Sequence, residues 1–409
     1  MTLSRRSFLR RSAAVGAAGL AGAELAACGG EDGRAEAAAS ADAGLKRRVA
    51  FDGRHQAGVI SAPSPEATFV ALDAIAPDTA ALAQALQQLS AHARALTEGY
   101  RFAQSDRGTP PPDSGTLGTA VDPDGLTVTI AFGASLFDAR FGLAGKRPDG
   151  LERMRRFPDD DIDEDRAHGD VLVTLNAGRR DTVVHAMREL LRPVRGALAV
   201  RWTLDGFLSS DRGPTAGSAR RNLFGFRDGT SNPSGAELDR LLWLGPGAGW
   251  AAGGTFQVVR TIRMHVEFWD RVGLREQEAM IGRTRDTGAP LGGTDERQDP
   301  RLDLDPHGRR IPTDAHIRLA NPRTAATADQ RILRRGFNYH RGIDPGGQLD
   351  QGLVFVAYNA SIQRQFEAIQ TRLADEPMTD YVTPVGGGYY FVPRGTTGPT
   401  DWVGSGLLS

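Results

Sequence analysis

The chain of 409 residues contains only one cysteine, Cys28, and this scarcity excludes several kinds of site. One cysteine cannot build a disulfide framework, a four-cysteine zinc site or a cysteine-ligated iron–sulfur cluster. The chain also lacks an excess of either charge, because 49 Lys and Arg residues face 50 Asp and Glu residues. A protein that binds nucleic acid electrostatically would carry a basic excess, so no nucleic-acid partner is expected.

Several common catalytic signatures are also missing. The chain has no Gly-Lys-Ser/Thr phosphate loop, no His-Glu-x-x-His metal motif and no Gly-x-Ser-x-Gly nucleophile elbow. It has no Cys-x-x-Cys-His either, so any haem would be held without a covalent bond. An acidic run at 159–165 lacks the ligand-spaced glycine of a calcium loop and is interpreted as a solvated loop.

The first 28 residues resemble an export signal. Arg5-Arg6 followed by Ser-Phe-Leu resembles a twin-arginine signal, and the apolar run after it is far shorter than the ~20 residues of a membrane span. Leu-Ala-Ala-Cys28 resembles a lipobox, in which the cysteine is lipidated; the alternative is an ordinary cleavage site beside an unrelated cysteine. A lipidated Cys28 would hold the protein at the membrane surface, on its periplasmic or extracellular face. Residues 29–46 are expected to form a flexible tether.

From about residue 47 the sequence turns globular, with 40% hydrophobic residues overall. Strands are expected at 68–72, 126–132, 170–175 and 197–202, with helices at 180–192 and after Asp78, which should cap its helix. The second half repeats this pattern, with strands at 255–268 and 353–358 and helices near 271–282 and at 361–374. The pattern indicates an α+β protein of two ferredoxin-like halves with antiparallel sheets, at 47–215 and 216–409.

One long segment, 284–331, interrupts this pattern. It shows almost no periodicity and is rich in Asp, Arg, Pro and Gly. A loop much longer than ~15 residues inside a compact domain is usually functional or disordered. Because the segment contains His307 and His316, it is the first place to look for chemistry.

Two motifs carry a resemblance to a known family. Gly225-Phe-Arg-Asp228-Gly229 resembles the GxxDG signature of dye-decolorizing peroxidases, in a segment that continues to Pro233. His316-Ile-Arg…Asn321-Pro-Arg and the later Ile-Leu-Arg-Arg-Gly resemble that family's proximal haem-ligand and distal-arginine segments. The resemblance spans roughly residues 47–395 and is closest to the branch of exported deferrochelatases and peroxidases of iron-uptake operons. It implies a fold of the dimeric α+β barrel type, with the haem mainly in the C-terminal half.

The resemblance implies a catalytic role for three residues. His316 would be the proximal ligand of the haem iron, since neutral imidazole binds ferric iron. Asp228 would take a proton from peroxide and return it to the leaving oxygen. Arg334 would stabilise the negative charge that develops as the O–O bond breaks, although the adjacent Arg335 could take this role instead.

Further residues are implied as contacts of the haem. Arg323 would pair with a propionate, because carboxylates suit the arginine fork. Arg260 and Arg283 are weaker candidates for the same role, and surface salt bridges explain them equally well. The other implied haem contacts are Gly229, Thr230, Ser231, Asn321, Pro322 and Arg334 itself. His307 and His340 are candidates for neighbouring groups, and the sequence does not identify the carboxylate that should support the proximal imidazole.

Two functions follow from the resemblance. The first is a peroxidase with non-covalent haem b, which uses hydrogen peroxide to oxidise dye-like, phenolic or porphyrin donors in one-electron steps. The second is a haem- or iron-handling protein of an iron-uptake system, either a deferrochelatase or a haem carrier, with other proteins of that system as partners. Asp228 and Arg334 favour the first, because simple carriage needs neither a proton shuttle nor a distal cation. The family also implies a homo-oligomer.

Overall fold

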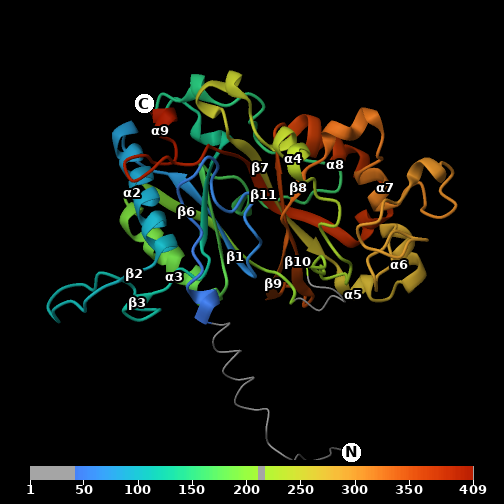
Figure 1. The fold of residues 1–409 in the computed structure, drawn as a ribbon, viewed down its shortest axis with the longest axis horizontal. Coiled ribbons are helices and arrows are strands. Elements are labelled where there is room, and N and C mark those ends of the chain that lie inside the picture. Colours follow the sequence, from blue (N-terminus) through green and yellow to red (C-terminus); the bar gives the residue numbers. More distant parts are fainter. Residues whose placement is uncertain (1–41, 211–216, 409) are drawn as a thin grey trace, which may run out of the picture. The chain divides into compact units, whose positions relative to one another are not determined.

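Two antiparallel four-stranded modules with the same strand order form the centre of the fold (Figure 1). In the computed structural model, which describes residues 42–210 and 217–408, the first module contains β1 (Glu66–Ala74), β4 (Thr127–Gly133), β5 (Val171–Ala177) and β6 (Leu198–Phe207). The second contains β7 (Thr255–Met264), β9 (Phe337–Ile343), β10 (Leu349–Asn359) and β11 (Val382–Val392). The orders β4-β5-β1-β6 and β9-β10-β7-β11 are both ferredoxin-like, as expected.

The two modules meet at two narrow seams. β11 pairs with β4 at Tyr390↔Gly133 and Phe391↔Phe132, and β6 pairs with β9 at Phe207↔Asn338. These seams join the two sheets into one closed ring of strands. A short strand, β8 (Leu333–Arg334), pairs with β10 just before the chain enters β9.

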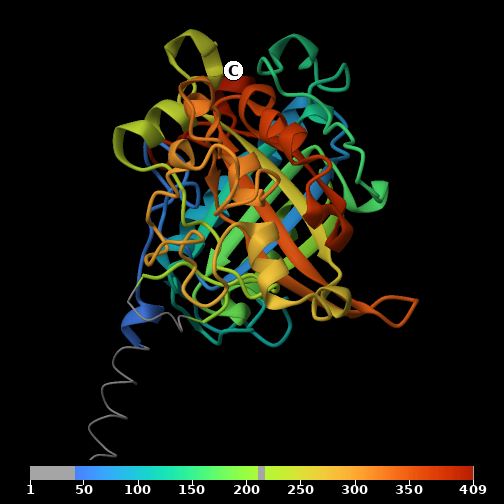
Figure 2. The same ribbon diagram turned by 90° about the vertical axis from the view of Figure 1, so that its right-hand side faces the viewer.

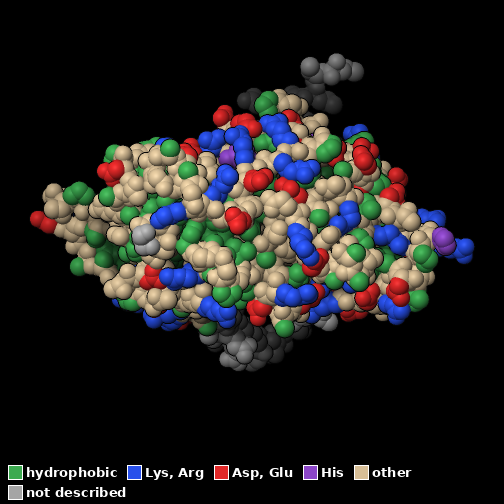
Figure 3. All heavy atoms as spheres, turned by 90° about the horizontal axis from the view of Figure 1, so that it is seen from above, with side chains coloured by type: hydrophobic (Ala, Val, Ile, Leu, Met, Phe, Trp, Pro, Cys, Tyr) green, Lys and Arg blue, Asp and Glu red, His purple; other side chains and the backbone are tan. Residues whose placement is uncertain are grey.

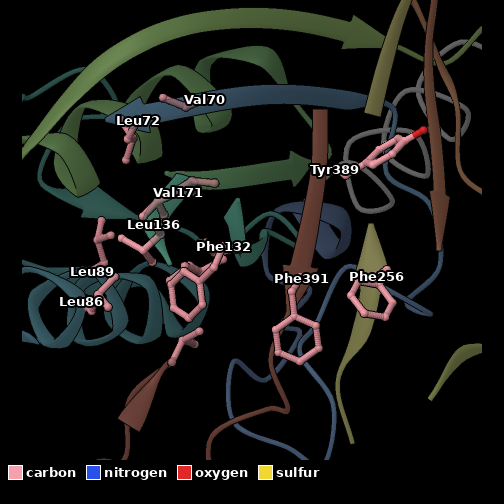
Figure 4. Close-up of a cluster of buried hydrophobic side chains, with 14 of the residues drawn as sticks. Val70, Leu72, Leu86, Leu89, Phe132, Leu136, Val171, Phe256, Tyr389 and Phe391 are labelled. Carbon is pink, nitrogen blue, oxygen red and sulfur yellow. The ribbon is translucent and has the colours of Figure 1, made fainter. Parts of the chain in front are cut away.

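Two long helices cover the outer face of the first module. α2 (Thr79–Glu98) begins as expected at Asp78, whose side chain accepts a hydrogen bond from the Ala81 amide at 2.8 Å. Its apolar face includes Leu86 and Leu89, which lie toward the sheet in Figure 4. The second helix, α3 (Arg180–Leu191), packs beside α2 on the same sheet. This face of the module is therefore filled by side chains.

The crossovers of the second module are shorter and more irregular. β7 leads to α5 (Val266–Trp269) and α6 (Leu274–Ile281), and the long segment that follows contains α7 (His316–Ala320). After β10 comes a π-helix (Ile362–Glu367), which runs into α8 (Ala368–Leu373). Figures 1 and 2 show α6, α7 and α8 gathered on one side of the second module.

The remaining elements are short. They are α4 (Gly235–Leu242), α9 (Ser405–Leu408), the strand pair β2 (Tyr100–Arg101) and β3 (Ala120–Val121), and 3-10 turns at Ala134–Leu136, Ala144–Lys146, Glu164–Arg166, Arg192–Val194, Pro246–Ala251, Leu302–Leu304, Ala325–Gln330 and Pro377–Tyr381. Within the described residues, no helix combines the length and apolar character that crossing a bilayer requires. Cys28 and the expected signal lie outside the described residues.

The prediction of a strand over 255–268 was wrong at its C-terminal end. β7 stops at Met264, and 266–269 form the helix α5. Three further elements, α4, β9 and β11, were not expected from the sequence. The run Val-Thr-Pro-Val-Gly-Gly-Gly that begins β11 is poor in β-forming residues, and pairing with β7 along most of its length overrides that preference.

Candidate functional site

A large cavity lies between the outer face of the second sheet and the irregular crossovers. Its lining residues all fall between 222 and 384, so the cavity belongs to the second module, where the haem was expected. Ile262 and Met264 of β7 and Leu353 and Phe355 of β10 form its sheet wall. The empty space within it, together with the open solvent at its mouth, amounts to about 1630 Å³. Side chains from β7, β10, α7, α8 and the loop of Asp228 all contribute to its lining, so a flat group that spans these elements could be enclosed.

His316 stands at the start of α7 and lines this cavity. Its Nδ1 lies 2.8 Å from Oε2 and 3.0 Å from Oε1 of Glu376, whose side chain is buried. The carboxylate fixes the imidazole and leaves Nε2 with no hydrogen-bond partner in the described chain. Burial disfavours the protonated ring, but the charge and hydrogen bond of Glu376 outweigh it and raise the pKa of His316. Such an imidazole is oriented and electron-rich, as an iron ligand should be.

Glu376 is the carboxylate that sequence reasoning could not place. It lies 60 residues after His316, between α8 and a 3-10 turn, in an Asp-Glu-Pro sequence that looks like an ordinary loop. No local pattern connects it to the histidine. Only the packing of α8 beside α7 brings the two side chains together.

Asp228 and Arg334 form an ion pair in the cavity wall. An Arg334 guanidinium nitrogen lies 2.7 Å from Oδ1 of Asp228, and the two side chains are 29% and 27% exposed. Both charges influence His316 electrostatically, which places all three groups in one site. A permanent cation beside a carboxylate provides a proton acceptor and a stabiliser of developing negative charge. The structure thus brings together the three residues to which the sequence assigned the chemistry.

The loop that carries Asp228 is a tight turn. The Asp228 amide donates to the Arg220 carbonyl at 2.9 Å, and the next residue, Gly229, has φ 85°. A side chain rarely adopts that conformation, so glycine is needed there. Thr230 and Ser231 continue the loop and line the cavity, while Gly229 itself does not reach the wall.

The third expected segment, Asn321-Pro322-Arg323, also lines the cavity. Arg323 has φ 57° and donates to the Ser231 hydroxyl at 3.2 Å, and its ion pair with Asp299 measures 3.4 Å. Burial lowers the pKa of Arg323. These contacts join the ligand segment to the loop of Asp228 and leave a guanidinium at the wall that a carboxylate could approach.

Arg260 and Arg283 are not surface salt bridges, so that explanation was wrong. Both are buried in the cavity wall, at 1% and 4% exposure. Arg260 forms a buried ion pair with Asp160. Asp160 belongs to the acidic run that was interpreted as a solvated loop, and for this residue the interpretation was wrong. Arg283 donates to the carbonyls of Gly288 and Glu296, and burial together with the neighbouring arginines lowers its pKa to about 10.

Three other candidates lie away from the cavity. Arg335 donates to the Ser61 carbonyl at 2.5 Å and does not line the wall, so Arg334 is the arginine that faces the site. His307 and His340 are exposed and contribute nothing to the lining. These two histidines are close to the residues of the site only along the sequence.

The residues present fit haem on three counts. The cavity is large and has apolar walls, and His316 offers a free nitrogen. Among the described residues, three buried guanidinium nitrogens in the wall have no hydrogen-bond partner, namely Nε and Nη1 of Arg260 and Nε of Arg331. Unpaired buried donors are costly, and carboxylate groups such as propionates would satisfy them. Haem, a flat apolar ring with acidic propionate groups, matches this arrangement.

An imidazole held by a carboxylate and an acid–arginine pair, together in one large apolar cavity, define a site of the haem-peroxidase class. A family model described as the N-terminal part of Dyp-type peroxidase matches residues 56–208, and one described as its C-terminal part matches residues 219–397. The chain belongs to the Dyp-type peroxidase family. It is therefore a peroxidase that binds haem and takes peroxide and a reductant as substrates.

Individual relatives agree with this assignment. A protein named deferrochelatase from Escherichia coli (strain K12) is 40% identical over 413 residues, which cover 99% of this chain and 97% of that protein. Another deferrochelatase, from Yersinia pseudotuberculosis, is 42% identical over 365 residues, or 88% and 84% of the two chains. The crystal structure of a DyP-type peroxidase from Cellulomonas bogoriensis superposes with a TM-score of 0.81 at 35% identity, covering 90% of this chain and 99% of that one. Ferric DtpA from Streptomyces lividans gives a TM-score of 0.80 at 32% identity, covering 89% and 97%.

Proposed function

We propose that the protein is a peroxidase with non-covalent haem b, in which His316 binds the iron and Asp228 and Arg334 activate hydrogen peroxide. The observation that carries this proposal is the 2.7 Å ion pair of Asp228 and Arg334 in the same cavity as His316. Haem supplies the iron at which peroxide is reduced and which then takes single electrons from an organic donor. The donors we propose are dye-like, phenolic or porphyrin compounds.

Each residue has a defined task in this proposal. His316 would hold the iron through Nε2, and Glu376 orients the ring and would strengthen its donor character. Asp228 removes a proton from peroxide and delivers it to the oxygen that leaves as water. Arg334 stabilises the negative charge on that oxygen until the proton arrives. Arg260, Arg323 and Arg331 are the side chains that would bind the propionates.

A second function, the release of iron from haem, has one observation in its favour. The relatives at 40% and 42% identity are named deferrochelatase. The Asp228–Arg334 pair favours the peroxidase function over simple carriage of haem, because holding haem for delivery does not require a proton shuttle. Partners from an iron-uptake system belong to this second function.

We further propose that the protein is exported and works outside the cytoplasm. The support is the Arg5-Arg6 pair and the Leu-Ala-Ala-Cys28 sequence. A lipid on Cys28 would hold the enzyme at the membrane surface.

The surface charge does not suggest a nucleic-acid partner. On the face seen in Figure 3, acidic and basic side chains are mixed, whereas a nucleic-acid-binding face would be mainly basic. Assembly into a homo-oligomer is also proposed, from the family resemblance.

Two substitutions test the proposed chemistry. Asp228→Asn removes the proton acceptor and Arg334→Leu removes the cation, and each should lower kcat/KM for peroxide by about 10²–10³-fold while the Soret band of haem remains. Arg335→Leu is the matched control, because it removes the neighbouring guanidinium that lies outside the cavity. Haem-loaded Asp228→Asn and Arg334→Leu proteins with wild-type turnover would show that peroxide is not activated by this pair.

A further inference from the structure

The side-chain amide of Asn232 binds both backbone polar groups of Arg334. Its Nδ2 donates to the Arg334 carbonyl at 2.9 Å, and its Oδ1 accepts from the Arg334 amide at 2.9 Å. We propose that Asn232 is a positioning residue that sets the geometry of the Asp228–Arg334 pair. This inference deepens the proposed function and rests on it.

Arg334 needs such support because its strand is short. β8 contains two residues and is paired only with β10, at Ala357↔Arg334 and Tyr358↔Leu333. The next amide, that of Arg335, donates to Val356 of β10 at 2.8 Å. Backbone groups alternate in direction along a strand, so the amide and carbonyl of Arg334 point away from β10, to a side where no strand is paired with β8. Asn232 supplies the two hydrogen bonds that a neighbouring strand would otherwise make.

Asn232 is itself fixed relative to Asp228. The two residues belong to one turn, in which the Asn232 amide donates to the Gly229 carbonyl at 3.4 Å and Asp228 is held by the Arg220 carbonyl. Arg331 donates to the Ser231 carbonyl at 3.0 Å, and its own carbonyl accepts from Gln365 at 2.6 Å. The turn is therefore connected a second time, at the residue before Asn232, to the segment that leads into β8.

This arrangement makes Asn232 a direct link between the turn of Asp228 and the backbone of Arg334 itself. Asp228 is carried by the turn and Arg334 by β8, and these segments are about 100 residues apart in sequence. The side chain of Asn232 fixes the backbone of one to the loop of the other, and the 2.7 Å contact of the carboxylate with the guanidinium depends on that register. A displacement of about 1 Å in a catalytic group can cost ~10²-fold in rate. Asn232 should therefore affect catalysis without contacting the reacting atoms.

The test uses the haem-loaded protein and two substitutions, Asn232→Ala and Asn232→Leu. Leucine has the same branched side-chain skeleton as asparagine but makes no hydrogen bond, so both variants should behave alike if the amide is what matters. We measure kcat/KM for peroxide and the affinity of the ferric protein for cyanide, read from the shift of the Soret band. Cyanide binds as an anion after losing a proton, so its affinity reports on both members of the pair without turnover. Each variant should keep its haem and show losses of about 10-fold in both quantities.

Gln56→Ala is the matched control. Gln56 binds the amide and the carbonyl of Ile130 in the first module in the same way, at 2.8 and 2.9 Å, and neither residue lines the cavity. Its loss should lower thermal stability and leave cyanide affinity unchanged. Wild-type cyanide affinity in haem-loaded Asn232→Leu would overturn the proposal, and so would loss of haem from both Asn232 variants while Gln56→Ala retains it. Arg334→Leu separates the two proposals: if it also binds cyanide and peroxide normally, the proposed function fails; if it does not, only the role of Asn232 fails.

Discussion

Each module contains a histidine beside a carboxylate, His185 in the first and His316 in the second. The two histidines differ in whether one ring nitrogen is left without a hydrogen bond. His185 on α3 is 1% exposed, and both of its nitrogens are engaged, by the Ser114 hydroxyl at 2.8 Å and the Tyr100 hydroxyl at 3.2 Å. His316 is engaged only at Nδ1, by Glu376, and it faces a cavity. A histidine can bind a metal only through a free nitrogen. The comparison shows that burial beside a carboxylate does not make a site unless one nitrogen remains available.

The first module comes close to a metal site by residue type. Donor atoms of Asp113, His185 and Glu189 lie within 4.8 Å of one another. Each is already in use, because Asp113 accepts from Tyr100 and Gly115, and Glu189 accepts from Ser114 and Arg192. These contacts attach the segment after β2 to α3, so this group is structural.

The same contrast holds for the modules as a whole. Both have the ferredoxin-like strand order, and in the first module α2 and α3 fill the outer face of the sheet. In the second module, the corresponding face is lined by Ile262, Leu353 and Phe355, which border the cavity. A segment of about 50 residues after α6 replaces the long helix there and supplies His316. The chemistry thus depends on the crossovers, which differ between two modules of the same topology.

The largest difference is expected from replacing the two histidines. His316→Ala should lose the haem or bind it weakly, with a reduced Soret band and no measurable peroxide turnover, because the iron loses its protein ligand. His185→Ala should keep the haem and the turnover. It should lower the free energy of unfolding by about 1–3 kcal/mol, because the hydrogen bonds of the buried ring with Ser114 and Tyr100 are lost. Absorbance spectra and denaturant unfolding measure the two effects. A normal Soret band and normal turnover in His316→Ala would assign the iron ligand elsewhere.

A smaller effect is expected from the supporting carboxylates. Glu376→Gln keeps a hydrogen-bond acceptor for His316 but removes the charge, so the imidazole becomes a weaker donor and ferric iron is stabilised less. The Fe(III)/Fe(II) midpoint potential should rise, and turnover should fall by about 10–100-fold. Glu189→Gln, in the first module, should change neither quantity. An unchanged potential in Glu376→Gln would mean that its charge does not tune the iron.

Much of the first module could be predicted from the sequence. In its strands, apolar and polar residues alternate or apolar residues are continuous, and Asp78 is a recognisable N-cap for α2. β9 and β11 could not be predicted, since Gly386-Gly387-Gly388 in β11 has little strand propensity and is held by its neighbour β7. The local sequence pattern predicts secondary structure where the residues of a segment themselves favour it. The prediction fails where pairing with a neighbouring strand determines the structure.

The site shows the same limit. His316, Asp228 and Arg334 were found because they stand in recognisable motifs, which record chemistry. Glu376 stands in no such motif, and Asn232 lies in the segment of the Asp228 motif without a chemical role that the motif suggests. The roles of both come from contacts across 60 and 102 residues of sequence. The interpretation of Asp160 failed for the same reason, because its partner Arg260 lies 100 residues away, in the other module.

The smallest effect on catalysis is expected from the apolar residues of the two outer sheet faces. Leu86 of α2 is fully buried against the first sheet, as Figure 4 shows, and Leu86→Ala should cost about 2–5 kcal/mol of unfolding free energy with unchanged turnover per haem. Leu373 of α8 lines the cavity, so Leu373→Ala should cost less stability and loosen the haem instead. Denaturant unfolding and the rate of haem loss from the loaded protein distinguish these outcomes. Leu86 and Leu373 belong to one cluster of buried residues that extends across both modules. If Leu86→Ala released haem faster than Leu373→Ala did, packing at α2 would be coupled to the haem cavity more strongly than the lining of the cavity itself, and the contrast between the two modules would not hold.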